Sequence, residues 1–120
     1  MRIAANSLAP LTLPHLYEGE GILQLEEYLD KAKLHGMGRR VGLMTIPPGC
    51  SIGKHTHHGE FEFYYVLSGE GAYSDDEQSY QIAPGDFTLC DAEHSHAVVN
   101  EGTEELRLFI GIINLPSNLA

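Results

Sequence analysis

The stretch from Gly49 to Gly69 constrains this chain more than any other, because it places three potential metal ligands at fixed spacing between two glycines. Five residues separate Gly49 from His55, and one separates His55 from His57. Four more residues precede Glu62, and six lead to Gly69. Side chains at positions i and i+2 of a β-strand point to the same face. His55 and His57 can therefore approach one ion together.

Glu62 has the opposite parity from the two histidines, but residues 58–60 are typical of a turn, after which a new strand resets which parity faces inward. Parity therefore does not exclude Glu62 as a ligand. Both faces of the new strand are apolar enough that we expect both to be covered. One face carries Glu62, Tyr64 and Val66, and the other carries Phe63, Tyr65 and Leu67.

Length and composition restrict the class of protein. A chain of 120 residues predicts a single domain, residues 1–120, large enough to bury a core. Its formal net charge of −10 opposes nucleic-acid binding, which needs clustered Lys and Arg. Two cysteines, Cys50 and Cys90, make no disulfide framework, and we expect both in the core. The absence of a signal-peptide pattern and of a long apolar run predicts a soluble cytoplasmic protein without a membrane partner.

Short apolar segments between Gly and Pro turns predict about eight strands, and hence an all-β sandwich or barrel of jelly-roll type. Residues 1–14 are broken by prolines and are expected to form an arm on the outside of the domain or against a partner subunit. Residues 22–25 fit a short strand or part of a helical stripe, and we favour a strand followed by one or two helical turns that end near Gly36. The remaining predicted strands are residues 40–46, 62–68, 71–74, 79–82, 87–90, 96–99 and 105–113, with an acidic hairpin tip at 75–78 and a tail at 114–120.

The spacing from Gly49 to Gly69 resembles the first of the two signature motifs of the cupin superfamily at every position. The second motif is matched in part: Gly85, His96 and Asn100 stand at its glycine, histidine and asparagine positions. Asp91 and Glu93 stand where that motif has proline and glycine. The likeness covers roughly residues 40–113 and is closest to small single-domain bacterial cupins, which implies a double-stranded β-helix, or jelly-roll barrel, with an N-terminal arm.

The resemblance implies that His55, His57, Glu62 and His96 bind one divalent metal ion per chain inside the barrel, and that Asn100 is structural. Three imidazoles and one carboxylate suit Mn, Fe, Ni or Zn, and four protein ligands leave an octahedral ion about two open positions. The competing interpretation, an exposed polar strand edge, is disfavoured because His96 recurs at the spacing of a second motif.

Candidate catalytic groups beyond the ligands are His94, Tyr64 and Glu93, with Glu60 as a further acid or base. His94 shares parity with His96 and faces either the mouth of the barrel or solvent. Tyr64 is expected to point inward, as core packing or as a catalytic group. Glu93 and Asp91 face either solvent or the rim of the pocket. We expect His58 and Glu60 to be solvated, and Tyr73 and Tyr80 to be structural.

Three functions agree with these residues. The favoured one is a metal-dependent enzyme, of isomerase, decarboxylase or dioxygenase type, acting on a small oxygen-rich molecule such as a hydroxy acid, a keto acid or a sugar derivative. The second is a non-catalytic module that binds a small molecule or sugar. The third is a domain whose metal only fixes the fold. A homodimer is predicted as well, because an apolar arm at residues 3–13 can cover an edge strand of a partner.

Overall fold

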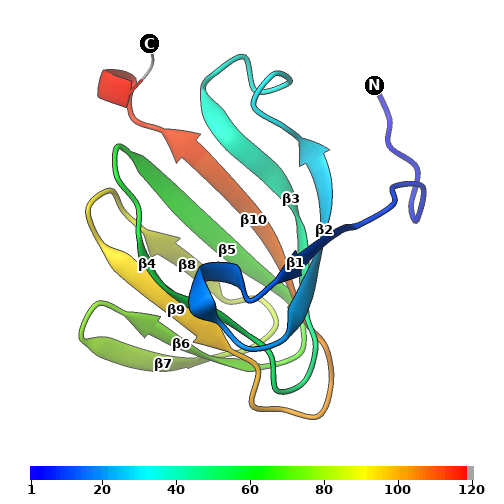
Figure 1. Cartoon of the computed structure of the whole chain (residues 1–120), viewed down its shortest axis with the longest axis vertical. Coiled ribbons are helices and arrows are strands. Elements are labelled where there is room, and N and C mark those ends of the chain that lie inside the picture. The colour runs from blue at the N-terminus through cyan, green and yellow to red at the C-terminus, as the bar shows by residue number, and fades with distance from the viewer. Residues whose placement is uncertain (119–120) are drawn as a thin grey trace.

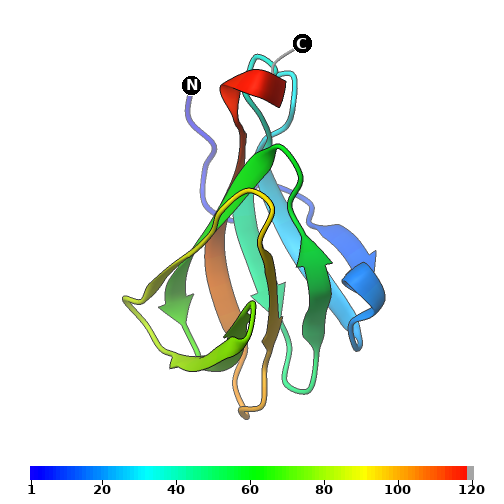
Figure 2. The same cartoon turned by 90° about the vertical axis from the view of Figure 1, so that its left-hand side faces the viewer.

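The computed structural model describes residues 1–118, which form two antiparallel sheets that face each other across one core (Figures 1 and 2). The larger sheet has the strand order β1-β2-β3-β10-β5-β8, and the smaller has the order β4-β9-β6-β7. This arrangement confirms the predicted all-β jelly roll. The strands are β1 (Leu11–Pro14), β2 (Ile22–Leu29), β3 (Gly38–Ile46), β4 (Ser51–Thr56), β5 (Glu60–Ser68), β6 (Gly71–Asp75), β7 (Gln78–Ile82), β8 (Phe87–Cys90), β9 (Ser95–Val99) and β10 (Leu106–Asn114).

Alternation of side chains in β5 and β10 builds the core between the sheets. Tyr64 and Val66 of β5 are buried beside Leu108 and Ile110 of β10, to which they pair directly. The outer face of β5 differs from the expectation, because Tyr65 and Leu67 are exposed. They lie on the outer face of the larger sheet. An antiparallel sheet can pack one face on the core and leave the other in contact with solvent.

The segment after β2 corrects a second expectation. The strand continues to Leu29, because residues 24–29 pair with β3, and the predicted helical turns do not form. Residues 31–36 make hydrogen-bonded turns instead, ending at His35 and Gly36, both with positive φ. Pairing with a neighbouring strand thus overrides the helical spacing of apolar residues. At the other end, β10 includes Asn114, the first residue of the predicted tail. A 3-10 helix, η2 (Pro116–Asn118), follows within the tail, and residues 119–120 lie outside the described part.

The N-terminal arm is partly an edge strand, since β1 pairs with β2 of its own chain. A 3-10 helix, η1 (Leu16–Glu18), follows it and packs on β4 (Figure 2). A Cβ atom on Gly53 would lie 1.9 Å from the Tyr17 carbonyl oxygen, so only glycine permits this contact. Within residues 1–118, no helix has the length and apolarity needed to cross a membrane.

Candidate metal centre

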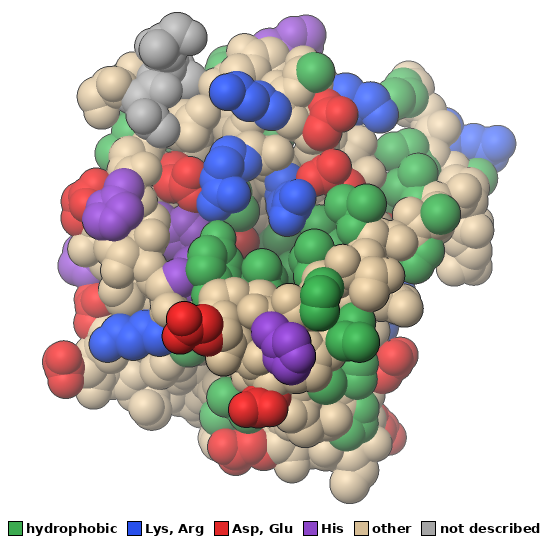
Figure 3. All heavy atoms as spheres, viewed as in Figure 1, with side chains coloured by type: hydrophobic (Ala, Val, Ile, Leu, Met, Phe, Trp, Pro, Cys, Tyr) green, Lys and Arg blue, Asp and Glu red, His purple; other side chains and the backbone are tan. Residues whose placement is uncertain are grey.

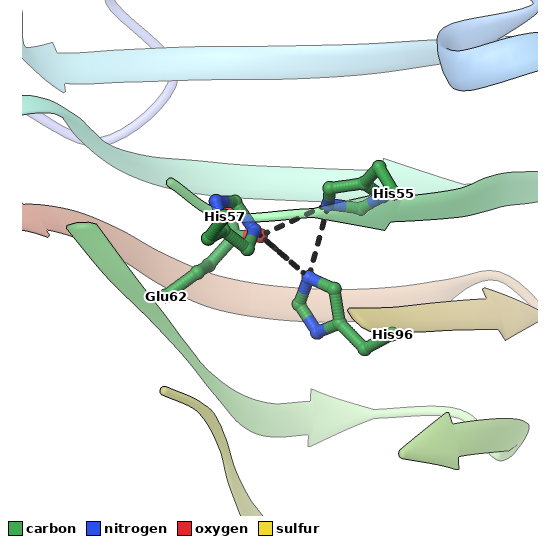
Figure 4. A group of neighbouring side chains, drawn as sticks. All are labelled: His55, His57, Glu62 and His96. Atoms are coloured by element: carbon green, nitrogen blue, oxygen red, sulfur yellow. Dashed lines mark hydrogen bonds and ion pairs between the residues drawn. The ribbon is translucent and has the colours of Figure 1, made fainter. Parts of the chain in front are cut away.

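Four side chains converge between the two sheets, and they are the four implied by the resemblance (Figure 4). His55 lies near the end of β4, and His57 follows that strand directly. Glu62 comes from the inner face of β5, and His96 comes from β9. Pairing of β4 with β9 places His55 opposite His96. One ligand atom from each residue lies within 4.8 Å of all the others, so this cluster is able to bind a metal ion.

The spacing of the donor atoms fits one ion. His96 Nε2 lies 3.0 Å from His55 Nε2 and 3.1 Å from His57 Nε2. Glu62 Oε1 lies 3.0 Å from His96 Nε2, 3.1 Å from His57 Nε2 and 3.7 Å from His55 Nε2. Donors bound cis to an octahedral ion at about 2.1 Å are about 3.0 Å apart. Four of these five separations therefore match the geometry that an octahedral ion requires.

Hydrogen bonds at the far side of two rings decide which nitrogen faces the cluster. His55 Nδ1 lies 2.8 Å from the carbonyl oxygen of Gly53, and His57 Nδ1 lies 2.7 Å from Glu60 Oε2. Both partners are acceptors, so each Nδ1 carries the proton and donates it. The neutral tautomer then leaves an Nε2 lone pair that points into the cluster, as a metal ligand needs.

The third imidazole has a similar arrangement. His96 Nδ1 lies 2.9 Å from the Tyr73 hydroxyl, whose oxygen can accept a hydrogen bond from this nitrogen. Tyr64 packs on His96 with its ring centroid 5.0 Å away, and its hydroxyl donates to Glu62 Oε1 at 3.2 Å. Tyr64 is buried, as predicted, and burial raises its pKa well above the ordinary value. All three imidazoles therefore have their Nδ1 engaged and their Nε2 directed toward Glu62.

The electrostatics of the cluster favour a cation. Burial would raise the pKa of Glu62, but the three adjacent imidazoles outweigh burial and hold that pKa well below its usual range. Burial lowers the pKa of His96. Burial also opposes protonation of His57, yet the neighbouring carboxylates of Glu62 and Glu60 leave its pKa raised. A carboxylate that stays ionised among buried imidazoles is a natural partner for a divalent ion.

Glu60 corrects the expectation that it is solvated. It begins β5, is buried, and shares the inner face with Glu62 because the two are two residues apart. Its carboxylate accepts two hydrogen bonds from Arg39, from Nε at 2.9 Å and from Nη2 at 2.8 Å, as well as the bond from His57. Burial would raise the pKa of Glu60, but Arg39 and His57 hold it below the usual range. His58, by contrast, is exposed as expected.

His94 and Glu93 lie on an exposed loop outside the four-residue cluster. His94 Nδ1 is 2.6 Å from Asp76 Oδ2, and this contact raises the pKa of His94. The Glu93 carboxylate binds His58 Nδ1 at 2.8 Å and accepts the backbone N–H of Gly59 at 3.1 Å. Glu93 has a φ of 69°, the left-handed conformation that favours glycine, which explains the glycine of the usual motif. Asp91 is likewise exposed.

The sequence analysis assigned no functional role to two residues that lie near the site. The Tyr17 ring stacks on His55, with 3.9 Å between ring centroids and 9° between planes. Tyr73 was expected to be structural only, yet it is buried and contacts His96. The signal for Tyr73 lies in the pairing of β6 with β9, which the sequence does not specify. Asn100 is buried and donates to the carbonyl oxygens of Ile46 and Glu104, in agreement with a structural role.

The fold and the site together define a jelly-roll protein with a cluster able to bind a metal ion between its sheets. Residues 42–112 match the cupin domain family, and the chain belongs to that family. It is 34% identical to an oxalate-binding protein of Thermotoga maritima over 115 residues, which are 96% of this chain and 95% of the relative.

Two solved structures extend this comparison. The crystal structure of a predicted oxalate decarboxylase from Thermotoga maritima superimposes with a TM-score of 0.92 at 34% identity, covering 96% of this chain and 100% of that one. A putative sugar phosphate isomerase from Acidithiobacillus ferrooxidans superimposes with a TM-score of 0.68 at 30% identity, covering 78% of this chain and 60% of that one.

Proposed function

We propose that the protein binds one divalent transition-metal ion through Nε2 of His55, His57 and His96 and the carboxylate of Glu62, and that the loaded site binds a short dicarboxylate such as oxalate. One observation carries the proposal: each imidazole has its Nδ1 engaged by a separate partner, so three Nε2 lone pairs face one buried carboxylate. This arrangement suits Mn, Fe, Ni or Zn.

The donor count supports a chelating ligand. Four protein donors leave about two positions of an octahedral ion open, and the two carboxylates of oxalate can occupy them together. The metal would supply Lewis-acid binding of carboxylate oxygens. The relative from Thermotoga maritima is named an oxalate-binding protein and shares nearly its full length with this chain, which favours the same ligand class.

Two arginines beside the site are compatible with an anionic ligand. Arg40 pairs with Ile112, which pairs with Glu62, so Arg40 and Glu62 share the inner face of the larger sheet. Each guanidinium has a carboxylate partner: Arg39 pairs with Glu60 and Arg40 with Glu27. Lys and Arg side chains, with Asp and Glu among them, lie beside the hollow between the sheets (Figure 3). In a chain with a net charge of −10, the two arginines neutralise carboxylates near the site and would thereby lessen repulsion of a dianion.

The positions of the candidate acids and bases favour binding over turnover. Decarboxylation needs a proton for the carbon that remains after CO2 leaves. Tyr64 is buried behind Glu62 with a raised pKa, while His94 and Glu93 engage Asp76 and His58 on the exposed loop. A metal-dependent enzyme acting on a hydroxy acid, a keto acid or a sugar derivative is the second candidate, favoured by the similarity to a predicted oxalate decarboxylase.

Calorimetry on protein loaded with Mn²⁺ or Co²⁺ tests the proposal. Oxalate should bind the loaded protein with about one ligand per chain and should not bind the His96→Ala variant, which lacks one metal ligand. The His94→Ala variant is a matched control and should bind as the unaltered protein does. If the metal-loaded protein bound no oxalate, the proposed ligand class would be wrong and the ion would have a structural role only. Release of formate and CO2 from oxalate would establish the enzyme instead.

We also propose that the protein is a cytoplasmic homodimer. The exposed apolar face of the larger sheet, which includes Tyr65, Leu67, Phe87 and Leu89, supports a covered interface. Light scattering at micromolar concentration should give twice the chain mass of 13.2 kDa. The mass of a single chain would contradict the homodimer.

A further inference from the structure

The ligand side chains differ in exposure, and the difference shows where the site opens to solvent. His96 is 0% exposed and His57 2%, whereas Glu62 is 6% and His55 7% exposed. Solvent therefore reaches the cluster beside His55 and Glu62. The Tyr17 ring covers His55 at this point, nearly parallel to it.

Tyr17 reaches from one sheet toward the other. Its ring lies on His55 of the smaller sheet, and its hydroxyl comes close enough to Arg39 of the larger sheet to contribute, after Glu60, to the raised pKa of that guanidinium. Arg39 in turn holds Glu60, the partner of the ligand His57. One side chain thus connects both walls of the site at the point where the ligand atoms come nearest to solvent.

The backbone, as well as the stacking of the ring on His55, holds Tyr17 in this place. His15, Tyr17 and Glu18 have φ values of 47°, 52° and 64°, a conformation that costs free energy in residues other than glycine. The Tyr17 carbonyl rests against Gly53 so closely that no side chain could be accommodated there. Tyr17 itself remains 43% exposed. Strain retained for an exposed aromatic ring beside a ligand cluster indicates a functional placement.

We propose that Tyr17 is a specificity-determining residue of the metal centre, which limits the length of the carboxylate ligand by closing the space between His55 and Arg39. This inference rests on the proposed binding of dicarboxylates. Oxalate, with two carbons, lies close to the ion and fits beneath the ring. Malonate and succinate are longer and must displace the ring or bind through one carboxylate only, so the ring selects against them.

The test compares Tyr17→Ala and Tyr17→Phe with Tyr28→Ala, all loaded with Mn²⁺. Tyr28 is a matched control because it is a partly exposed tyrosine of β2 that lies outside the four-residue cluster and outside the proposed dimer interface. Tyr17→Ala should reduce the preference for oxalate over succinate by about tenfold or more, the discrimination that one methylene group can provide in a pocket. Tyr17→Phe should retain most of the preference, because the ring is kept. An unchanged preference in Tyr17→Ala, or an equal change in Tyr28→Ala, would overturn the proposal.

Two further measurements keep the inference decidable. If Tyr17→Ala folds poorly, Gly53→Ala serves as a second variant, because its side chain displaces the same segment through the backbone; it should relax the selection in the same way. If the unaltered protein binds no dicarboxylate, the proposed function fails, and access to the metal then decides the role of Tyr17. Pyridine-2,6-dicarboxylate should remove Co²⁺ faster from Tyr17→Ala than from the Tyr28→Ala control, because the covering ring is lost. Equal rates of removal would overturn the proposal.

Discussion

Glu60→Gln is the most informative single substitution outside the ligands, because Glu60 connects the ligand His57 to the guanidinium of Arg39. Its carboxylate accepts hydrogen bonds from His57 Nδ1 and twice from Arg39, at 2.7, 2.9 and 2.8 Å. Glutamine keeps the shape but offers one acceptor oxygen for three donors, and its amide nitrogen faces another donor. Either the fork of Arg39 or the orientation of His57 must be lost.

The expected loss can be estimated from that geometry. Residues that orient a metal ligand typically contribute 10- to 100-fold to affinity, so Glu60→Gln should weaken Mn²⁺ or Zn²⁺ binding by about 1.4–2.7 kcal/mol. Competition with a fluorescent chelator at pH 7.5 measures the change. The matched control is Glu27→Gln, since Glu27 accepts a hydrogen bond from Arg40 Nε at 2.8 Å but contacts no ligand. Equal affinities of the two variants would refute the reasoning that Glu60 orients His57.

Three other outcomes test separate parts of the structure. Leu108→Ala should lower the free energy of unfolding in urea by about 2–5 kcal/mol, because Leu108 is fully buried in the core, and an unchanged denaturation midpoint would argue against that position. Asp91→Pro with Glu93→Gly should keep both metal and ligand preference, because the two carboxylates lie on an exposed loop, and an altered preference would place them at the pocket instead. The Cys90 thiol should react with a disulfide reagent only after unfolding, since burial raises its pKa to about 12, and rapid reaction of the folded protein would contradict its burial.

Strand geometry and the resemblance to cupin motifs together predicted which side chains meet in the site. The i and i+2 spacing of His55 and His57 placed both on one face, and parity across the turn left Glu62 possible. The resemblance to the two cupin motifs implied Glu62 and His96 as the other members of the cluster. The same alternation applied to Glu60 would have placed it on the inner face with Glu62, but the turn was assigned one residue too far.

Other features depend on pairing that one sequence does not reveal. The contact of Tyr73 with His96 requires the register of β6 on β9. The stacking of Tyr17 on His55 requires left-handed conformations at Tyr17 and Glu18 in η1 and at His15 just before it. The extension of β2 to Leu29 comes from its pairing with β3, which prevails over local helical spacing. Long-range contacts, not local propensity, decide each of these.

Elemental analysis of the purified protein tests the central claim most directly. The unaltered protein should carry about one transition-metal ion per chain, whereas His57→Ala and His96→Ala should each lose most of it, because three remaining ligands no longer close the site. His94→Ala, an exposed histidine two residues from His96, should retain the full content. Unchanged metal in both ligand variants would contradict the assignment of this cluster as the metal centre.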